Sequence, residues 1–287
     1  MRVAVTGASG FVGRHVLTEL LRHEIEIVAA TRDAARLRGL HESIQIVEMD
    51  IAHPASDCFE QMGQPDVLIH LAWDGLPNYK SLHHFETELP RQYQFLKTMI
   101  EAGLPSLLVT GTCFEYGMQS GPLSESMPTR PDNPYGFAKD ALRRQLEFLK
   151  SVKPFSLAWA RLFYMYGEGQ PSTSLYPKLK EAVLRGDKVF NMSGGEQLRD
   201  YLSAGDVARR IVRCALLHRD IGAVNICSGK PVSVRWLVEQ WLRENNWEIA
   251  LNLGYYPYPD YEPMAFWGST EEPATLLSKE RELRNVS

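Results

Sequence analysis

The sequence predicts an α/β fold in which a doubly wound parallel sheet carries a smaller C-terminal lobe for substrate binding. Short β-rich runs alternate with amphipathic helical patterns over the first half of the chain. A glycine-rich loop also follows the first β-rich run and opens the first helix. Strands that alternate with helices are typical of βαβ units, so we expect helices on both faces of the sheet.

The expected elements follow in order along the chain. The β-rich runs are RVAVTG, EIVAATR, IQIVEMD, DVLIHLAW, SLLVTGTC and FSLAWARLFY, and the helical patterns include GRHVLTELLRH, QYQFLKTMIEAG and the run that begins with YGFAK. Beyond residue 167 the pattern loosens and ends in an aromatic segment, GYYPYPDYEPMAFWG. We therefore predict a dinucleotide-binding domain over residues 1–167 and a smaller, interleaved substrate-binding lobe over residues 168–287.

Composition narrows the possible partners. The 287 residues carry a formal charge of -4 without a block of like charge, which disfavours nucleic acid or a membrane as partner. The N-terminal run MRVAVTGASGFVG does not resemble a leader, and no apolar window is long enough to span a bilayer. The cysteines are far apart and show no metal-binding spacing, which favours a reducing cytoplasm and a site without metal. They are Cys58, Cys113, Cys214 and Cys227.

The glycine-rich loop predicts a dinucleotide site. Gly7, Gly10 and Gly13 stand between a β-rich run and a helix. In such a loop the first glycine permits a tight turn, the second lets backbone approach a pyrophosphate, and the third lets the helix close on the strand. The strand before the loop and the helix after it favour cofactor binding over an ordinary tight turn.

The end of the second β-rich run bears on the choice of cofactor. An acidic residue at this position binds the ribose hydroxyl of NAD, whereas an arginine accommodates the 2′-phosphate of NADP. Thr31 stands where the acid is expected and Arg32 follows it, so we predict NADP(H). Asp33 leaves NAD(H) open, because another loop path brings it to the ribose. Asp50 and Ile51 close the third strand and are expected near the adenine.

Tyr135 and Lys139 begin an amphipathic, charge-rich helix in NPYGFAKDALRRQLEFLK. Residues at i and i+4 share one helix face, so the two side chains can meet. A nearby ammonium favours phenolate over phenol, and we expect it to lower the pKa of Tyr135. The alternative is a packing tyrosine beside a solvated lysine.

With both motifs in place, the sequence resembles the extended short-chain dehydrogenase/reductases that modify nucleotide sugars. VTGASGFVG is similar to that family's GxxGxxG, HLAW to its fourth-strand motif, GTCFEYG to its Ser/Thr motif and PYGFAK to its YxxxK. RLFYMYGEGQ, LRDYLSAGDVA and NICSGKPVSV resemble three later segments, in the family's order. The resemblance spans nearly the whole chain.

The resemblance implies roles for individual residues. The expected catalytic residues are Thr112, Tyr135 and Lys139. The expected cofactor-binding residues are Gly7, Gly10, Phe11, Val12, Gly13, Thr31, Arg32, Asp50, Ile51, Leu71, Ala72, Tyr135 and Lys139. The expected substrate-binding residues are Thr112, Cys113, Phe114, Glu125, Tyr164 and Arg199, with Arg199 on the nucleotide diphosphate. Tyr255, Tyr256, Tyr258 and Trp267 either wall the pocket or belong to the core. The resemblance also implies a homodimer formed through helices near residues 90–102 and 135–150.

Departures from the family pattern bear on the reaction. Cys113 and Phe114 replace the acid pair of the dehydratases, and Phe114 stands where epimerase-reductases carry a cysteine, so both reactions are disfavoured. Tyr164 and Glu88 replace family asparagines. We therefore predict NADPH-dependent reduction of a nucleotide-linked 4-keto-6-deoxyhexose. An NAD-dependent nucleotide-sugar 4-epimerase is the main alternative, and a non-catalytic dinucleotide sensor is the third hypothesis.

Overall fold

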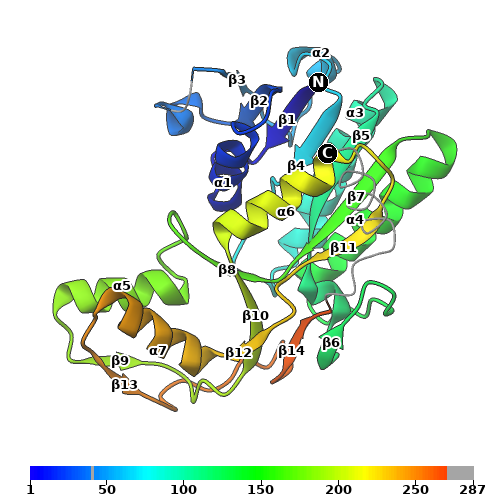
Figure 1. Ribbon diagram of the computed structural model, residues 1–287. Coiled ribbons are helices and arrows are strands. Elements are labelled where there is room, and N and C mark those ends of the chain that lie inside the picture. Colours follow the sequence, from blue (N-terminus) through cyan, green and yellow to red (C-terminus); the bar gives the residue numbers. More distant parts are fainter. Residues whose placement is uncertain (40–41, 270–287) are drawn as a thin grey trace, which may run out of the picture.

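A seven-stranded parallel sheet forms the centre of the computed structural model, which describes residues 1–39 and 42–269 (Figure 1). Its order is β11-β7-β5-β4-β1-β2-β3. The strands are β1 (Arg2–Thr6), β2 (Glu26–Thr31), β3 (Ile44–Glu48), β4 (Val67–His70), β5 (Ser106–Thr112), β7 (Ser156–Leu162) and β11 (Gly222–Ile226). The order turns at β1, which pairs with both β2 and β4. This arrangement confirms the predicted doubly wound α/β fold.

Helices cover both faces of the sheet. On one face lie α1 (Phe11–Leu20) and α6 (Ala204–Leu216), which pack on Val3, Val5 and their neighbours. The other face carries α2 (Cys58–Gln61), α3 (Leu89–Glu101) and α4 (Pro134–Val152), which pack around Ala4 and Leu68. Alternate residues of β1 therefore enter different cores, as the two-residue period of a strand requires.

A smaller lobe lies beside the main sheet (Figure 1). It holds α5 (Leu175–Arg185) and α7 (Val234–Asn245), with β9 (Val189–Asn191) paired to β13 (Ala250–Asn252). Their apolar faces form a separate core around Leu179, Phe190 and Trp241. A three-stranded sheet joins the halves: β10 (Leu198–Ser203) between β8 (Tyr164–Tyr166) and β12 (Pro231–Ser233). Finally, β14 (Phe266–Gly268) pairs with β6 (Gly121–Leu123).

The two halves are interleaved along the chain. After β8 the chain enters the lobe, returns to the main sheet for α6 and β11, and then leaves again for α7. The boundary at residue 167 therefore marks where the chain first leaves the main sheet, because later elements belong to both halves. Within the described part of the chain, the helices lack the combined length and apolar character that a membrane span needs.

Helix α1 approaches the glycine-rich loop closely at Gly13. A Cβ at Gly13 would lie 2.2 Å from the Gly7 carbonyl oxygen and 2.7 Å from that of Ala8. Both are backbone atoms, so we expect Gly13→Ala to lower the free energy of unfolding by about 1–3 kcal/mol, the usual cost of overpacking. Denaturant unfolding measures this loss.

Gly205→Ala is the matched control, since Gly205 also lies in a helix but a Cβ there would meet only Ser203 Oγ at 3.9 Å. Removing a helical glycine without overlap is expected to be neutral or to stabilise by up to about 1 kcal/mol. Equal effects of the two variants would contradict the close packing at Gly13.

Candidate active site

The glycine-rich loop forms one wall of a cleft of about 300 Å³ at the carboxyl ends of β1, β2 and β4. Gly7 has a φ of +67°, and a Cβ there would lie 2.7 Å from the backbone nitrogen of Ala72. Only glycine fits such a turn against the β4 end. The cleft lies where the strand order turns, the usual ligand position in doubly wound sheets.

The cleft has the features that a dinucleotide needs. Helix α1 begins here behind Gly10, and no side chain in the described part of the chain caps it. Its first-turn N–H groups are thus suited to an anion such as a pyrophosphate. Asp33 and Asp50 add carboxylates near the β2 and β3 ends, where ribose hydroxyls need acceptors.

Most predicted cofactor residues line this cleft. The predicted residues that line it are Gly7, Gly10, Thr31, Arg32, Asp50, Ile51, Leu71 and Ala72, together with Asp33, the alternative ribose contact. Phe11, Val12 and Gly13 instead lie in the first turn of α1, and Tyr135 and Lys139 lie beyond Trp73. Several lining residues were not predicted as cofactor contacts: Thr6, Ser9, Ala30, Arg36, Met49, Ala52, Trp73, Asp74, Glu88, Arg91 and Gln92. Ser9 and Trp73 adjoin motifs that were recognised, whereas Arg91 and Gln92 of α3 carry no sequence signal.

Thr112, Tyr135 and Lys139 lie close together beyond Trp73, a residue that lines the cleft. Asn133 caps α4 by accepting from Gly136 N at 2.8 Å, which sets Tyr135 in the first helical turn. A Cβ at Gly136 would lie 2.6 Å from the Phe114 carbonyl oxygen, so this turn abuts the segment after β5. Trp73 links these residues to the cleft: its ring lies 6.0 Å from that of Tyr135 and 4.0 Å from Lys139 Nζ.

The electrostatics of the pair differ from the sequence-based expectation. Burial raises the pKa of Tyr135 strongly, and a hydrogen bond with the Thr112 side chain only partly opposes this. Lys139 Nζ donates to the Thr110 carbonyl oxygen at 2.9 Å, and burial lowers the pKa of Lys139 to about 7. The expectation that Lys139 lowers the pKa of Tyr135 is therefore wrong here, because desolvation dominates both groups.

Aromatic rings enclose Tyr135. Tyr79 lies 5.6 Å and His84 lies 5.2 Å from it, measured between ring centroids. Tyr79 also contacts Phe114 at 4.9 Å and Tyr261 at 5.9 Å. Tyr261 comes from the C-terminal aromatic segment, whereas Tyr255, Tyr256 and Tyr258 are exposed and Trp267 lies in β14.

The tautomer of His84 follows from its partners. Trp73 Nε1, which can only donate, lies 3.1 Å from His84 Nδ1, and His84 Nε2 lies 2.9 Å from the Asn78 carbonyl oxygen. Only the neutral Nε2–H form satisfies both bonds. Burial also lowers the pKa of His84, which favours that neutral form. His84 begins a π-helical turn, η2 (His84–Glu88), a local irregularity that is common at functional sites.

A buried chain of polar side chains connects the glycine loop with η2. Thr6 Oγ1 lies 2.8 Å from His70 Nδ1, His70 Nε2 lies 2.7 Å from Gln92 Oε1, and Gln92 Nε2 donates to Glu88 at 2.8 Å. Burial lowers the pKa of His70 to about 3, so this histidine stays neutral. The chain fixes the carboxylate of Glu88 at the edge of the cleft.

Glu88 also belongs to a group of potential metal ligands with Asp74 and His83. His83 Nε2 lies 3.7 Å from a carboxylate oxygen of each. His83 Nε2 has no hydrogen-bond partner among the described residues, but the side chains of His83 and Asp74 are 33% and 61% exposed, so we assign no metal here.

Arg199 is buried in an internal network. Its guanidinium donates to Glu262 at 2.7 Å and to the carbonyl oxygens of Leu198 and Met264, and only 2% of its side chain is exposed. Tyr164 donates to the same carboxylate. A substrate diphosphate can therefore bind Arg199 only if Glu262 moves away from the guanidinium.

Two other predicted substrate residues, Glu125 and Cys113, have different surroundings. Glu125 accepts from the Asn225 backbone nitrogen at 2.8 Å and so holds its loop against β11. Cys113 is buried beside Phe114, and burial raises the pKa of its thiol, which remains protonated. The structure thus gives Glu125 a structural partner and keeps Cys113 in the wall.

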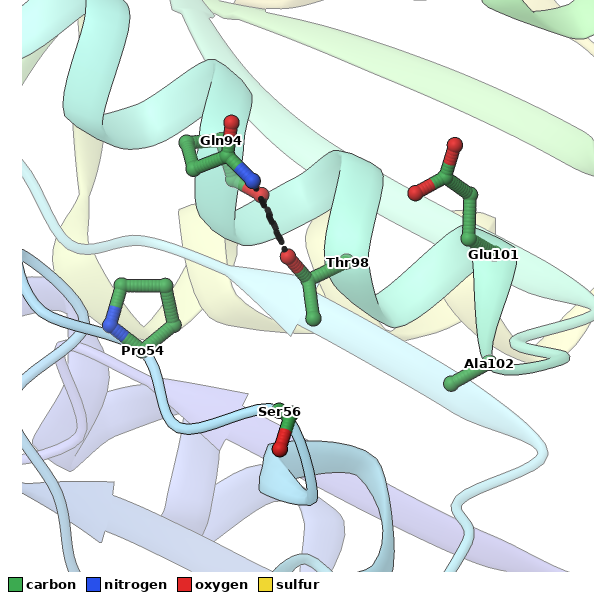
Figure 2. Close-up of a pocket in the computed structure, with 6 residues that line it drawn as sticks. All are labelled: Pro54, Ser56, Gln94, Thr98, Glu101 and Ala102. Atoms are coloured by element: carbon green, nitrogen blue, oxygen red, sulfur yellow. Dashed lines mark hydrogen bonds between the residues drawn. The ribbon is translucent and has the colours of Figure 1, made fainter.

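A second hollow, of about 510 Å³, lies between the segment around Pro54 and Ser56 and the outer side of α3 (Figure 2). Gln94 donates to Thr98 along its α3 wall at 3.4 Å, and Glu101 adds a carboxylate. Neither the glycine-rich loop nor Trp73, the neighbour of Tyr135 and Lys139, lines this hollow, so the candidate site remains the cleft at the glycine loop.

Comparison with known proteins agrees with this geometry. The model of the NAD dependent epimerase/dehydratase family matches residues 3–227. The dTDP-6-deoxy-L-talose 4-dehydrogenase (NAD(+)) of Aggregatibacter actinomycetemcomitans is 31% identical over 94% of this chain and 100% of its own length. The UDP-glucose 4-epimerase of Halalkalibacterium halodurans is 23% identical over 98% of this chain and 90% of its own.

Solved structures of similar fold are also known. The complex of MoeE5 with UDP-glucose and NAD has a TM-score of 0.81 and 27% identity, covering 97% of this chain and 92% of that one. The UDP-glucuronic acid 4-epimerase of Bacillus cereus has a TM-score of 0.82 over 97% of this chain and 93% of its own, but at 22% identity it supports the fold alone.

The cleft, the Thr-Tyr-Lys set and the doubly wound sheet define an NAD(P)-dependent oxidoreductase of the extended short-chain dehydrogenase/reductase type. The chain belongs to the NAD dependent epimerase/dehydratase family. The family resemblance predicted from the sequence is therefore confirmed. The predicted preference for NADP(H) is not supported, because the relative at 31% identity is an NAD(+) enzyme by name and the MoeE5 complex contains NAD.

Lys139 should make stability depend on pH in protein purified without nucleotide. Its pKa falls from 10.5 to about 7 on folding, so between these values the folded state binds fewer protons than the unfolded chain. Stability therefore rises with pH through this window. We expect this rise in the wild type and its loss in Lys139→Met, measured by denaturant unfolding across the window.

Lys97→Met is the control for this measurement, since Lys97 lies on the exposed side of α3. We expect its pH profile to follow the wild type. A Lys139→Met profile that matched the wild type would show that Lys139 keeps its ordinary pKa on folding.

Proposed function

We propose that the protein catalyses NAD(H)-dependent interconversion of a hydroxyl and a ketone at C4 of a nucleotide-diphosphate sugar. The observation that carries this proposal is the convergence of Thr112, Tyr135 and Lys139 beside Trp73, which joins them to the cofactor cleft. The named relatives support the substrate class: they act at C4 of nucleotide-linked sugars. A 6-deoxyhexose is our preferred sugar, after the relative at 31% identity.

The proposed chemistry assigns a task to each side chain. Tyr135 gives a proton to the C4 oxygen during reduction and takes it back during oxidation, and Thr112 hydrogen-bonds the same oxygen. The bound nicotinamide supplies or accepts the hydride. Because burial raises the pKa of Tyr135, the phenol predominates, and oxidation should speed up as the pH rises. Lys139 positions the nicotinamide ribose.

Asp33 supports NAD(H) as the cofactor. It lines the cleft next to Arg32, and its side chain accepts from Ala35 N at 2.9 Å, which fixes the carboxylate. A fixed carboxylate suits a ribose diol and repels a 2′-phosphate. Arg32 is exposed and can turn toward solvent.

Replacing Asp33 tests the cofactor preference. We expect Asp33→Asn to weaken NADH binding by about tenfold, the effect of one lost charge-assisted hydrogen bond, while NADPH binding improves or stays unchanged. Fluorescence titration with both nucleotides measures this. The control is Arg32→Gln, which should leave NADH affinity near the wild-type value. Tighter NADPH than NADH binding by the wild type would overturn the NAD(H) assignment.

The fate of the 4-keto sugar separates two candidate activities. A 4-dehydrogenase releases it, and the reverse reaction is the reduction predicted from the sequence. We favour the 4-dehydrogenase because the relative at 31% identity, which matches over its full length, carries that name. The comparisons nevertheless support the NAD-dependent 4-epimerase better than the NADPH-dependent reductase, and we keep the 4-epimerase as second candidate.

One experiment separates these candidates. The wild type is incubated with NAD⁺ and a panel of dTDP- and UDP-hexoses, while NADH absorbance and sugar NMR are followed. NADH that accumulates with a 4-keto product indicates a 4-dehydrogenase, and a C4 epimer without net NADH indicates a 4-epimerase. Tyr135→Phe should lose at least about 100-fold in turnover, the scale of general acid catalysis, but keep NADH binding. Turnover that survives in Tyr135→Phe would contradict the role proposed for Tyr135. A wild type that binds NADH but turns over no nucleotide sugar would favour the sensor hypothesis.

Three further assignments belong to the proposal. Arg199 binds the nucleotide diphosphate once Glu262 is displaced. The protein is cytoplasmic, consistent with its buried cysteines. It forms a homodimer through α3 and α4, since Phe137, Phe148 and Val152 leave α4 with an exposed apolar surface. Analytical ultracentrifugation that found only monomers would contradict the dimer.

A further inference from the structure

We propose that Glu115 is a positioning residue for the active site: its buried carboxylate holds the backbone of Thr112 and keeps a negative charge opposite the Lys139 ammonium. This inference rests on the proposed function for its link to catalysis. Glu115 lies in the 3₁₀ turn η3 (Cys113–Tyr116) that follows β5, and its side chain is fully buried.

Both oxygens of the Glu115 carboxylate accept hydrogen bonds. One oxygen accepts from Thr112 N at 2.9 Å and from Trp159 Nε1 at 2.9 Å, and the other accepts from Arg161 Nε at 2.7 Å. Thr112 in turn accepts from Phe114 N, which completes a capping box. A carboxylate held this way fixes the backbone conformation at Thr112, and with it the direction of the Thr112 hydroxyl.

The same carboxylate reaches the segment that anchors Lys139. Lys139 donates to the carbonyl of Thr110, and Glu115 accepts from the amide of Thr112. The two side chains therefore bind the β5 backbone at positions two residues apart. Gly111 lies between them. A Cβ there would lie 2.4 Å from Glu115 Oε1 and 2.2 Å from Trp159 Nε1, so the carboxylate lies directly against the strand. The glycine makes this close approach possible.

The surroundings of Lys139 make the charge of Glu115 matter. Lys139 is buried. Its ammonium lies over the ring of Trp73, and the neutral histidines His70 and His84 are nearby. Two carboxylates favour its charged form, first Glu115 and then Glu88, and they act against burial. Arg161, which pairs with Glu115, is fixed by Tyr116 at 2.9 Å. An ion pair in a low-dielectric site acts on a neighbouring charge more strongly than one in water.

NMR titration of Lys139 tests the electrostatic half of the proposal without any activity. Protein with carbon-13 in its lysine side chains is titrated, and the Lys139 signal is assigned from its absence in Lys139→Met. The double variant Glu115→Gln/Arg161→Met removes both charges and leaves no buried ion unpaired. We expect Lys139 to lose its proton about one pH unit lower than in the wild type. An unchanged titration overturns the proposal.

Two further variants separate charge from position. Glu115→Asp keeps the charge but withdraws the carboxylate by one methylene, so we expect about tenfold lower kcat with an unchanged Lys139 titration. Trp159→Phe removes one hydrogen bond to Glu115 and should lower stability alone, with kcat and titration unchanged. An unchanged kcat in Glu115→Asp overturns the positioning role. If the wild type itself turns over no nucleotide sugar, the proposed function fails, and the NMR titration still decides the effect of Glu115 on Lys139.

Discussion

A buried hydrogen bond from the Lys139 ammonium to the Thr110 carbonyl ties α4 to β5 and so holds Tyr135 close to the strand that carries Thr112. The lysine is 2% exposed, and a buried ammonium is costly unless nearby groups compensate for lost water. The carbonyl, the Trp73 ring and the carboxylates of Glu115 and Glu88 supply this compensation. The active site therefore exists in this form because one cation is buried at the junction of a helix and a strand.

Local signals predicted the frame of the site and the parts of it that lie close together in the sequence. The glycines of the loop and the helical spacing of Tyr135 and Lys139 are each set within one turn, so residue order alone indicates their geometry. Alternation of strands and helices gave the fold class for the same reason. Burial was harder to predict: spacing indicated that Tyr135 and Lys139 meet, but the sign of the effect on the tyrosine depended on how much water the fold excludes.

The rest of the site depends on contacts between distant segments. Tyr261 packs on Tyr79, Glu262 pairs with Arg199, and the polar chain from Thr6 ends at Glu88 more than eighty residues later. None of these pairings has a periodic signature. The predicted NADP(H) preference found no support among the relatives, and the sequence could not decide it, since Arg32 and Asp33 both follow β2 and only the path of the backbone decides which of them is held in place.

The interleaved course of the chain also affects how the protein emerges during synthesis. Strand β11, which completes the sheet at one edge, ends at Ile226. Among the residues that the structure describes, its strand partner is β7, which ends at Leu162. While residues 163–226 are being made, the backbone groups on one side of β7 have no strand to pair with. An unpaired, hydrophobic strand edge is a template for aggregation. The nascent chain is therefore exposed to aggregation through the β7 edge during this interval. The risk ends when β11 pairs with β7 and covers that edge.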